Sequence, residues 1–115
     1  MSTCQALVIP ADQAQPARVE TIGTDLETLQ TLVHGSIEAV SGKDWHFYLN
    51  EEGKILALMP NVRAAALVWE LTGALTDVYC GDVVFLGDDA QGEEADLPAH
   101  VIAIWEQTRI GQPTS

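Results

Sequence analysis

Short apolar runs alternate with segments of helical periodicity along this chain, which predicts a mixture of strands and helices. The run Ala6–Ile9 is continuously apolar and is closed by Pro10, as is typical of a buried strand. The alternating side chains of Arg18–Ile22 favour a second strand that pairs back on the first. Further strands are expected at Ile37–Val40, Trp45–Leu49 and Ile55–Met59, and within Val78–Leu86.

The first helix signal begins at Thr24. Thr24 and Glu27 match a capping box, in which the hydroxyl and the carboxylate each bond a free backbone N–H at the helix start. Leucines follow at helical spacing, so a helix is expected over about Asp25 to His34. Gly35 is predicted to end this helix in the left-handed conformation.

Two more helices are expected later in the chain. One runs from the N-cap Asn61 to Leu71 and ends near Gly73. It is apolar almost all round, so we expect either a central helix or a helix whose outer face meets another chain. The last helix is predicted to start at the N-cap Asp96, and a tail follows from Gly111.

Between two predicted strands lies an acidic turn, Asn50–Lys54. Glycine can take the positive φ that a hairpin bulge needs, so Gly53 predicts a hairpin here. The tip, Glu51, Glu52 and Gly53, is expected to fix the hairpin register or to form an exposed contact.

These elements follow the order β-β-α-β-β-β-α-β-α, and the 115 residues suit a single small acidic domain spanning 1–115. Strand runs broken by single helices favour the α+β class. We therefore predict a mixed, mostly antiparallel sheet of about five to six strands, with about three helices packed on one face.

Five short motifs form a spaced pattern along the chain. They are Ala6–Pro10, Asn50–Lys54, Pro60–Asn61 followed by Ala64, Gly81–Val84 and Asp96–Pro98. Together they resemble a family of short domains of unknown function found in actinobacterial phages, their hosts and mobile elements. The resemblance covers roughly Gln5 to Leu97 and implies a phage or mobile-element setting. It implies no established activity and supplies no catalytic residues.

The charge is strongly one-sided, with 17 acids against 5 bases and a formal net charge of -12. Neither Lys nor Arg occurs between Arg63 and Arg109. Such a chain repels nucleic acid and anionic membranes and attracts basic protein surfaces. A solvated surface and close mimicry of DNA are the alternative interpretations. The predicted partner-binding set comprises Asp77, Asp82, Asp88, Asp89, Glu93, Glu94, Asp96 and Trp69.

The sequence predicts no catalytic residue, metal site or cofactor. The acidic loop Asp88–Glu94 lacks the alternating oxygen ligands of a calcium loop. His34, His46 and His100 lack zinc-site spacing. Cys4 and Cys80 are expected to be free thiols, with a single bridge or a reactive Cys80 as alternatives.

The resulting expectation is a non-enzymatic phage-type interaction protein in the cytoplasm of a bacterial host. It would bind a basic surface of a host protein and serve in host takeover, and the sequence leaves a homodimer and a monomer both open. No apolar run reaches the roughly 18 residues of a membrane span. The alternative is a small-molecule binding or sensing module, with a pocket between the Asn61–Leu71 helix and the sheet near Trp69 and Tyr79. An enzyme is the third hypothesis.

Overall fold

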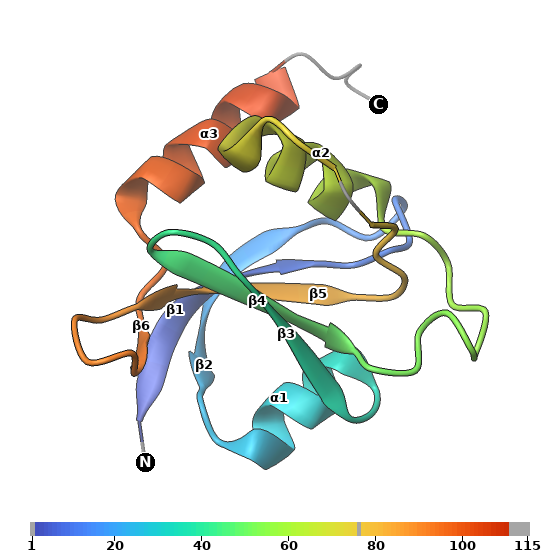
Figure 1. Ribbon diagram of the computed structural model, residues 1–115, viewed down its shortest axis with the longest axis horizontal. Coiled ribbons are helices and arrows are strands. Elements are labelled where there is room, and N and C mark those ends of the chain that lie inside the picture. Colours follow the sequence, from blue (N-terminus) through green and yellow to red (C-terminus); the bar gives the residue numbers. More distant parts are fainter. Residues whose placement is uncertain (1, 76, 111–115) are drawn as a thin grey trace.

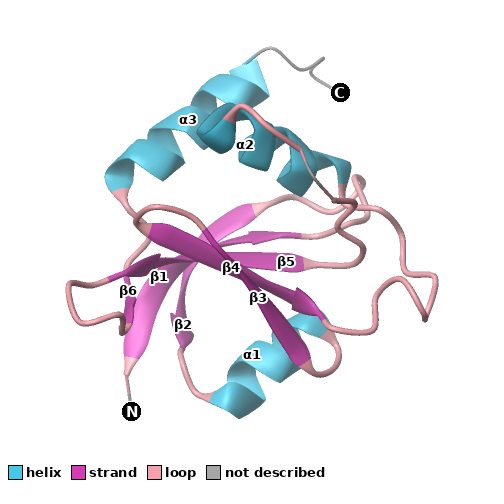
Figure 2. Ribbon diagram, viewed as in Figure 1, coloured by secondary structure: helices cyan, strands magenta, loops and turns pink. Residues whose placement is uncertain are grey.

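The structure is a computed structural model that describes residues 2–75 and 77–110, so the tail predicted from Gly111 lies outside it. One sheet has the strand order β2-β1-β5-β4-β3, with β6 beside β5, and the named pairs are antiparallel (Figure 2). The α+β prediction is therefore confirmed. The strands are β1 (Thr3–Ile9), β2 (Arg18–Gly23), β3 (Ile37–Ser41), β4 (Trp45–Asn50), β5 (Val83–Asp88) and β6 (Glu94–Ala95); the helices are α1 (Leu26–Val33), α2 (Val62–Thr72) and α3 (Ala99–Ile110).

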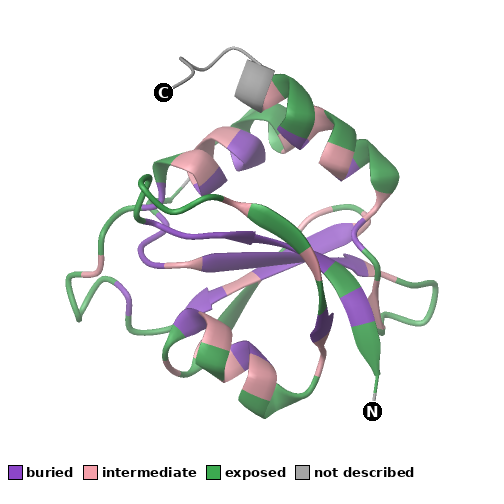
Figure 3. Cartoon of the chain, turned by 180° about the vertical axis from the view of Figure 1, so that it is seen from behind, coloured by how far each residue is buried: buried purple, intermediate pink, exposed green. Residues whose placement is uncertain are grey.

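Helices cover both faces of the sheet, with α1 on one side and α2 and α3 on the other (Figure 1). The prediction that the helices share one face was wrong. The central strands explain the arrangement, because alternate residues point to opposite faces. Leu7 and Ile9 of β1 join the core beneath α2 and α3, whereas Ala6 and Val8 join the core beneath α1. Both faces of β1 are thus buried in its C-terminal half, from Ala6 to Ile9, whereas its first residues include exposed ones (Figure 3).

Aromatic side chains fill the core beneath α2 and α3. The ring of Phe47 lies 4.8 Å from that of Phe85 and 5.0 Å from that of Tyr79, measured between centroids. Trp45 and Trp105 are buried in the same cluster. Trp69 differs, because 54 % of its surface remains exposed on α2.

Helix α2 begins and ends where the sequence predicts. Asn61 is the N-cap, and Gly73 ends the helix with φ 71°. The helix buries Ala64, Leu67 and Val68, and α3 packs along it within the same chain. Its outer face, including Trp69, stays exposed.

The start and end of α1 differ from the prediction. Asp25, and not Thr24, is the N-cap, and its carboxylate accepts the N–H of Thr28 at 3.1 Å. His34, and not Gly35, takes the left-handed conformation, with φ 64°. Gly35 is needed for a different reason: a Cβ there would lie 2.7 Å from Nδ2 of Asn50.

The strand predicted at Ile55–Met59 and the glycine-bulge hairpin before it were wrong. The segment forms consecutive turns, with Leu56 N–H donating to Glu52 O at 2.8 Å. Ile55 is 82 % exposed, so this apolar run faces solvent. Gly53 is buried, and a Cβ there would lie 2.7 Å from the carbonyl oxygen of Cys80. It permits a close backbone approach and is not an exposed tip.

β5 covers most of the strand expected within Val78–Leu86 and continues to Asp88. The chain after β5 needs correction, because the acidic segment there contains the two-residue strand β6. The carboxylate of Asp96 does not cap α3, because it accepts the N–H of Gln5 at 2.7 Å. The side chain of Asp96, which the sequence predicted as the N-cap of the last helix, instead bonds the backbone of β1.

Candidate functional site

The predicted partner-binding acids fall into two groups. Asp88, Asp89, Glu93, Glu94 and Asp96 gather at the β5–β6 hairpin. Asp82 precedes the other end of β5, and Asp77 lies before it. A strand rises about 3.3 Å per residue, so about 20 Å separates Asp82 from Asp88. The acids from Asp77 to Asp96 therefore form two surfaces at opposite ends of the sheet, and Trp69 lies on the helical layer.

The hairpin uses part of its charge to hold its own turn. Asp89 Oδ1 accepts the N–H groups of Gln91 and Glu93, each at 2.8 Å. Gly92, with φ 78°, allows the sharp reversal between them. Glu93 remains exposed at this end, beside the half-buried Glu94.

His46 was not among the predicted partner-binding residues, yet it anchors this hairpin to the sheet. His46 is only 6 % exposed. Its Nδ1 lies 2.5 Å from Oδ1 of Asp88 as a hydrogen bond. Its Nε2 lies 2.5 Å from Oε1 of Glu94, an ion-pair distance without hydrogen-bond angles, so this nitrogen lacks a well-directed partner among the described residues. The ring thus lies between two carboxylates, one of which it meets in a hydrogen bond.

Tyr48 completes the network, because its hydroxyl donates to Oε2 of Glu94 at 2.7 Å. Burial is the largest cause of a raised pKa at Tyr48, and the hydrogen bond to Glu94 and the negative charge of Glu94 raise this pKa further. The phenol therefore stays neutral and remains a donor. His46 and Tyr48 stack edge to face with ring centroids 5.0 Å apart.

Beside this network is a shallow hollow of about 380 Å³ on the sheet face that α1 covers only in part. Carboxylates and an aromatic ring together suit a cationic side chain, through charge and through the ring face. One sequence signal could have indicated the site: His46 and Tyr48 occupy alternate positions of one predicted strand and so share a face. The hollow is lined by Ala39, Ser41, His46, Tyr48, Asp88, Gly92, Glu93 and Glu94.

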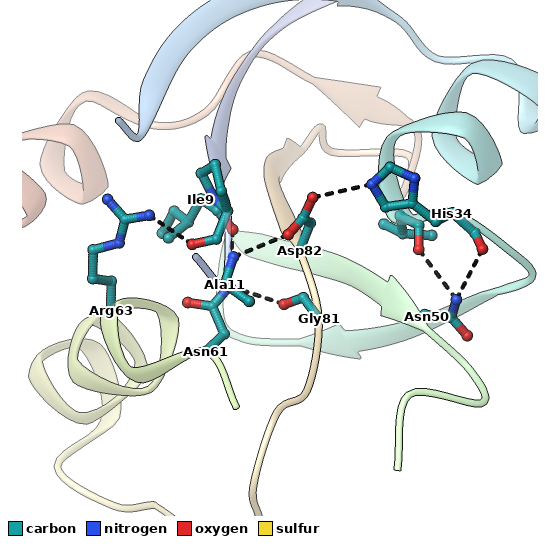
Figure 4. Close-up of polar contacts among 10 residues, drawn as sticks. Ile9, Ala11, His34, Asn50, Asn61, Arg63, Gly81 and Asp82 are labelled. Atoms are coloured by element: carbon teal, nitrogen blue, oxygen red, sulfur yellow. Dashed lines mark hydrogen bonds and ion pairs between the residues drawn. The ribbon is translucent and has the colours of Figure 1, made fainter. Parts of the chain in front are cut away.

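At the opposite end of the sheet, buried amides join the loops (Figure 4). Asn61 Nδ2 donates to the carbonyls of Ile9 at 2.8 Å and Gly81 at 3.0 Å. Its Oδ1 accepts the N–H of Ala64 at 3.0 Å, which caps α2. Residues from three of the motifs that carry the family resemblance, Ala6–Pro10, Pro60–Asn61 with Ala64, and Gly81–Val84, thus meet here, and the polar groups of Asn61 are satisfied by backbone. Asn61 therefore has a structural role, which is to hold these segments together.

Asn50 and Asp82 make further contacts at the same end of the sheet. Asn50 Nδ2 donates to the carbonyls of Val33 at 3.2 Å and His34 at 3.1 Å, which ties β4 to the end of α1. Asp82 Oδ1 accepts the N–H of Ala11 at 2.9 Å, and its Oδ2 lies 3.2 Å from Nε2 of His34 (Figure 4). Asp82 is therefore committed to contacts within the chain.

Asp77 and the predicted tip residues Glu51 and Glu52 remain to be placed, and Asp77 and Glu51 line one hollow. Asp77 pairs with Lys54, and this ion pair holds the pKa of Asp77 below its ordinary value. The side-chain hydrogen bond from Lys54 is the main cause, followed by the N–H of Val78. Glu51 and Glu52 are exposed.

The predicted ligand pocket between α2 and the sheet is occupied by core side chains, including Leu67 and Phe85. An apolar hollow of about 180 Å³ lies instead beside the start of α2, and Tyr79 but not Trp69 lines it. Sites for small molecules usually measure about 300 Å³ or more.

Within residues 2–75 and 77–110, no group of three or more His, Cys, Asp or Glu side chains is arranged to hold a metal ion. Cys4 and Cys80 are buried free thiols, and no disulfide joins them. Burial, followed by the charges of Asp96 and Glu94, raises the pKa of Cys4. None of the helices in the described part of the chain has the length and apolar character to cross a membrane.

No curated protein matches this chain. A chain in a crystal structure of the small RNA methyltransferase HEN1 is similar in fold, with a TM-score of 0.60 and 13 % sequence identity. The match covers 90 % of this chain but 16 % of that chain, so the likeness concerns the fold of a small part of that protein. A family model described as "Domain of unknown function (DUF3846)" matches residues 4–109. The resemblance to a family of unknown function is confirmed, and this chain belongs to the DUF3846 family.

Proposed function

We propose that this chain is a non-enzymatic interaction module that binds a basic surface of a partner protein through the carboxylates of its β5–β6 hairpin. The setting is a phage or mobile element acting in the cytoplasm of a bacterial host, and the partner is a host protein. The family resemblance motivates the setting, and the charge distribution motivates the chemistry.

The observation that carries the proposal is the concentration of carboxylates around one open hollow. Asp88 and Glu94 line it beside the ring of Tyr48, and Glu93 lines its exposed side. The segment that supplies these acids contains no Lys or Arg. Attraction between these carboxylates and a basic surface accelerates association. The ring of Tyr48 can also form a cation–π contact with an Arg or Lys side chain.

Two triple variants of equal net charge test the proposal. In the hairpin variant, Ala90, Gln91 and Glu93 become lysine; in the control, Ala103, Glu106 and Gln107 of α3 become lysine. All six positions are exposed, and each variant replaces one glutamate and two neutral residues. Only the position of the added positive charge differs.

Each protein is used to capture partners from bacterial lysate, and the captured protein is identified by mass and then purified for affinity measurements. We expect the hairpin variant to bind at least about tenfold more weakly than the α3 variant at low salt. We also expect the wild-type affinity to fall steeply as ionic strength rises. Equal losses in the two variants, or an affinity independent of salt, would refute the proposal.

A further inference from the structure

Large apolar side chains gather on the surface away from the β5–β6 hairpin. Val62 and Val78 are each 57 % exposed, and Leu75 is 47 % exposed. All three line the hollow of about 180 Å³ between the start of α2 and the segment that follows the helix. Ala65 and Tyr79 also line it. Single exposed apolar residues are ordinary, whereas a group around one hollow indicates a contact surface.

Helix α2 extends this surface toward its C-terminus. Val62, Ala65 and Trp69 follow the spacing of three and four residues that places side chains on one helical face. Trp69, at 54 % exposure, therefore continues the apolar stripe beyond the hollow. Tryptophan is enriched among the residues that dominate binding energy at protein interfaces.

A second hollow, of about 110 Å³, adjoins the first and adds acidic side chains to a partly apolar lining. Glu38, Glu51 and Asp77 line it together with Lys54. Lys54 pairs with Asp77, so the lining keeps a net negative charge. Asp77, Val78 and Tyr79 line both hollows, so a peptide that crosses Val78 passes from the mainly apolar hollow to the one with more acids.

We propose that the two hollows bind a short segment of a partner protein in which an apolar side chain is followed by lysine or arginine. The apolar side chain enters the hollow beside α2, and the cation crosses Val78 to reach Glu38 and Glu51. This site is distinct from the hairpin, so it does not depend on the proposed function.

Size and charge both favour this occupant. An apolar cavity of about 150 Å³ is large enough for benzene, so the hollow beside α2 accepts a leucine or phenylalanine side chain. A second copy of this chain fits poorly, because each copy carries a formal charge of -12 and brings acids to this end. A basic segment gains from the same field.

Synthetic peptides provide the probe. Blocked glycine peptides carry one leucine and one arginine, separated by zero, one or two glycines. In the matched peptides, glutamate replaces arginine or glycine replaces leucine. Binding is measured by NMR shifts of Val62, Ala65 and Val78. We expect the best leucine–arginine peptide to bind about tenfold more tightly than either matched peptide, a difference of about 1.4 kcal/mol.

Surface variants then locate the site. Val78→Asp and Glu51→Lys should each weaken peptide binding about fivefold or more. Leu26→Asp is the matched control, because Leu26 is 58 % exposed on α1, across the sheet. It should leave binding unchanged, and so should the triple lysine variant of the hairpin, which separates this site from the proposed function. Val78→Thr serves as a milder second variant if Val78→Asp unfolds.

Three results would overturn the inference. Equal binding of the leucine–glutamate peptide would make the hollow a general apolar pocket. Unchanged binding in both Val78→Thr and Glu51→Lys would place the peptide elsewhere. Sedimentation that shows a dimer, dispersed by Val78→Asp, would make a second copy the occupant.

Discussion

A single buried amide, Asn61, joins three parts of the fold. It is 1 % exposed and bonds the carbonyls of Ile9 and Gly81 and the N–H of Ala64. Replacing it with alanine removes the cap and leaves both carbonyls buried without this donor. We expect Asn61→Ala to lower the free energy of unfolding by about 3 kcal/mol, measured by urea denaturation.

Asp25→Ala is the control for this prediction, because Asp25 caps α1 in an exposed position. Its loss should be clearly smaller, since water can solvate the freed N–H groups. Asn61→Asp separates the two roles, because the carboxylate can still accept from Ala64 but cannot donate. Equal losses for Asn61→Ala and Asp25→Ala would contradict a role for the buried carbonyls.

The chain's two tyrosines predict a pH dependence. Burial raises the pKa of both Tyr48 and Tyr79, and Glu94 and Asp77 respectively add to it. In the unfolded chain a phenol ionises near about pH 10. Above that pH the folded state binds more protons than the unfolded state, so stability falls as pH rises toward the folded pKa values.

Urea denaturation at about pH 9 and about pH 11 measures this loss, and phenolate absorbance follows ionisation in the native state. The Tyr48→Phe variant should lose less stability over the same interval. Native tyrosines that ionise near about pH 10 would contradict the prediction.

Glycines show how far single residues could be interpreted from sequence. Gly73 was predicted correctly because helix ends have a local signature, and its φ is 71°. Gly35 and Gly53 were misinterpreted as positive-φ positions. Each is required by a neighbour distant in sequence, the amide of Asn50 and the carbonyl of Cys80. Such approaches depend on tertiary contacts, which local patterns do not contain.

At the scale of elements, the β5–β6 hairpin depends on side chains from β4. β6 has two residues, and Tyr48 and His46 hold Glu94 and Asp88 to the sheet. Tyr48→Phe removes one hydrogen bond, worth about 1 kcal/mol. We expect amide exchange at Gly87 and Ala95 to accelerate about fivefold, measured by NMR.

The β1–β2 pairing provides an internal control, because its backbone bonds involve neither Tyr48 nor Glu94. Its amides should exchange at nearly unchanged rates in Tyr48→Phe. If all protected amides accelerate equally, the bond supports the whole fold and does not specifically hold the hairpin.

Elements were predictable where local pattern and final environment agree. Ala6–Ile9 is apolar throughout and is buried on both faces of the sheet. Ile55–Met59 has a similar pattern, yet Ile55 and Met59 are exposed. β6 was missed because two half-buried residues carry no periodicity. The candidate site was only half predicted: its acids were named, but His46 and Tyr48 enter it through strand pairing.

At the scale of the whole molecule, composition predicted the sign of the field but not its shape. The acids from Asp77 to Asp96 are close in sequence, yet β5 separates them into two surfaces. Strand order also brings Glu38 of β3 to the hollow beside Asp77. Sheet topology, which local sequence patterns do not contain, therefore decides which carboxylates lie together.

The net charge of -12 also acts on stability, because like charges repel in the compact state. Exposed ion pairs such as Arg18–Glu20, at 3.1 Å, offset little of this, since such pairs contribute about 0–1 kcal/mol each. Salt screens the repulsion over distances beyond about 8–10 Å. We expect Tm to rise by about 2–5 °C between low and moderate NaCl, measured by circular dichroism.

The triple lysine variant of α3 is the matched test, because its net charge is less negative and its substitutions are exposed. Its Tm should start higher at low salt and rise less with NaCl, since less repulsion remains to be screened. A Tm that falls with salt, or rises equally in both proteins, would mean that specific ion binding and not general repulsion controls stability.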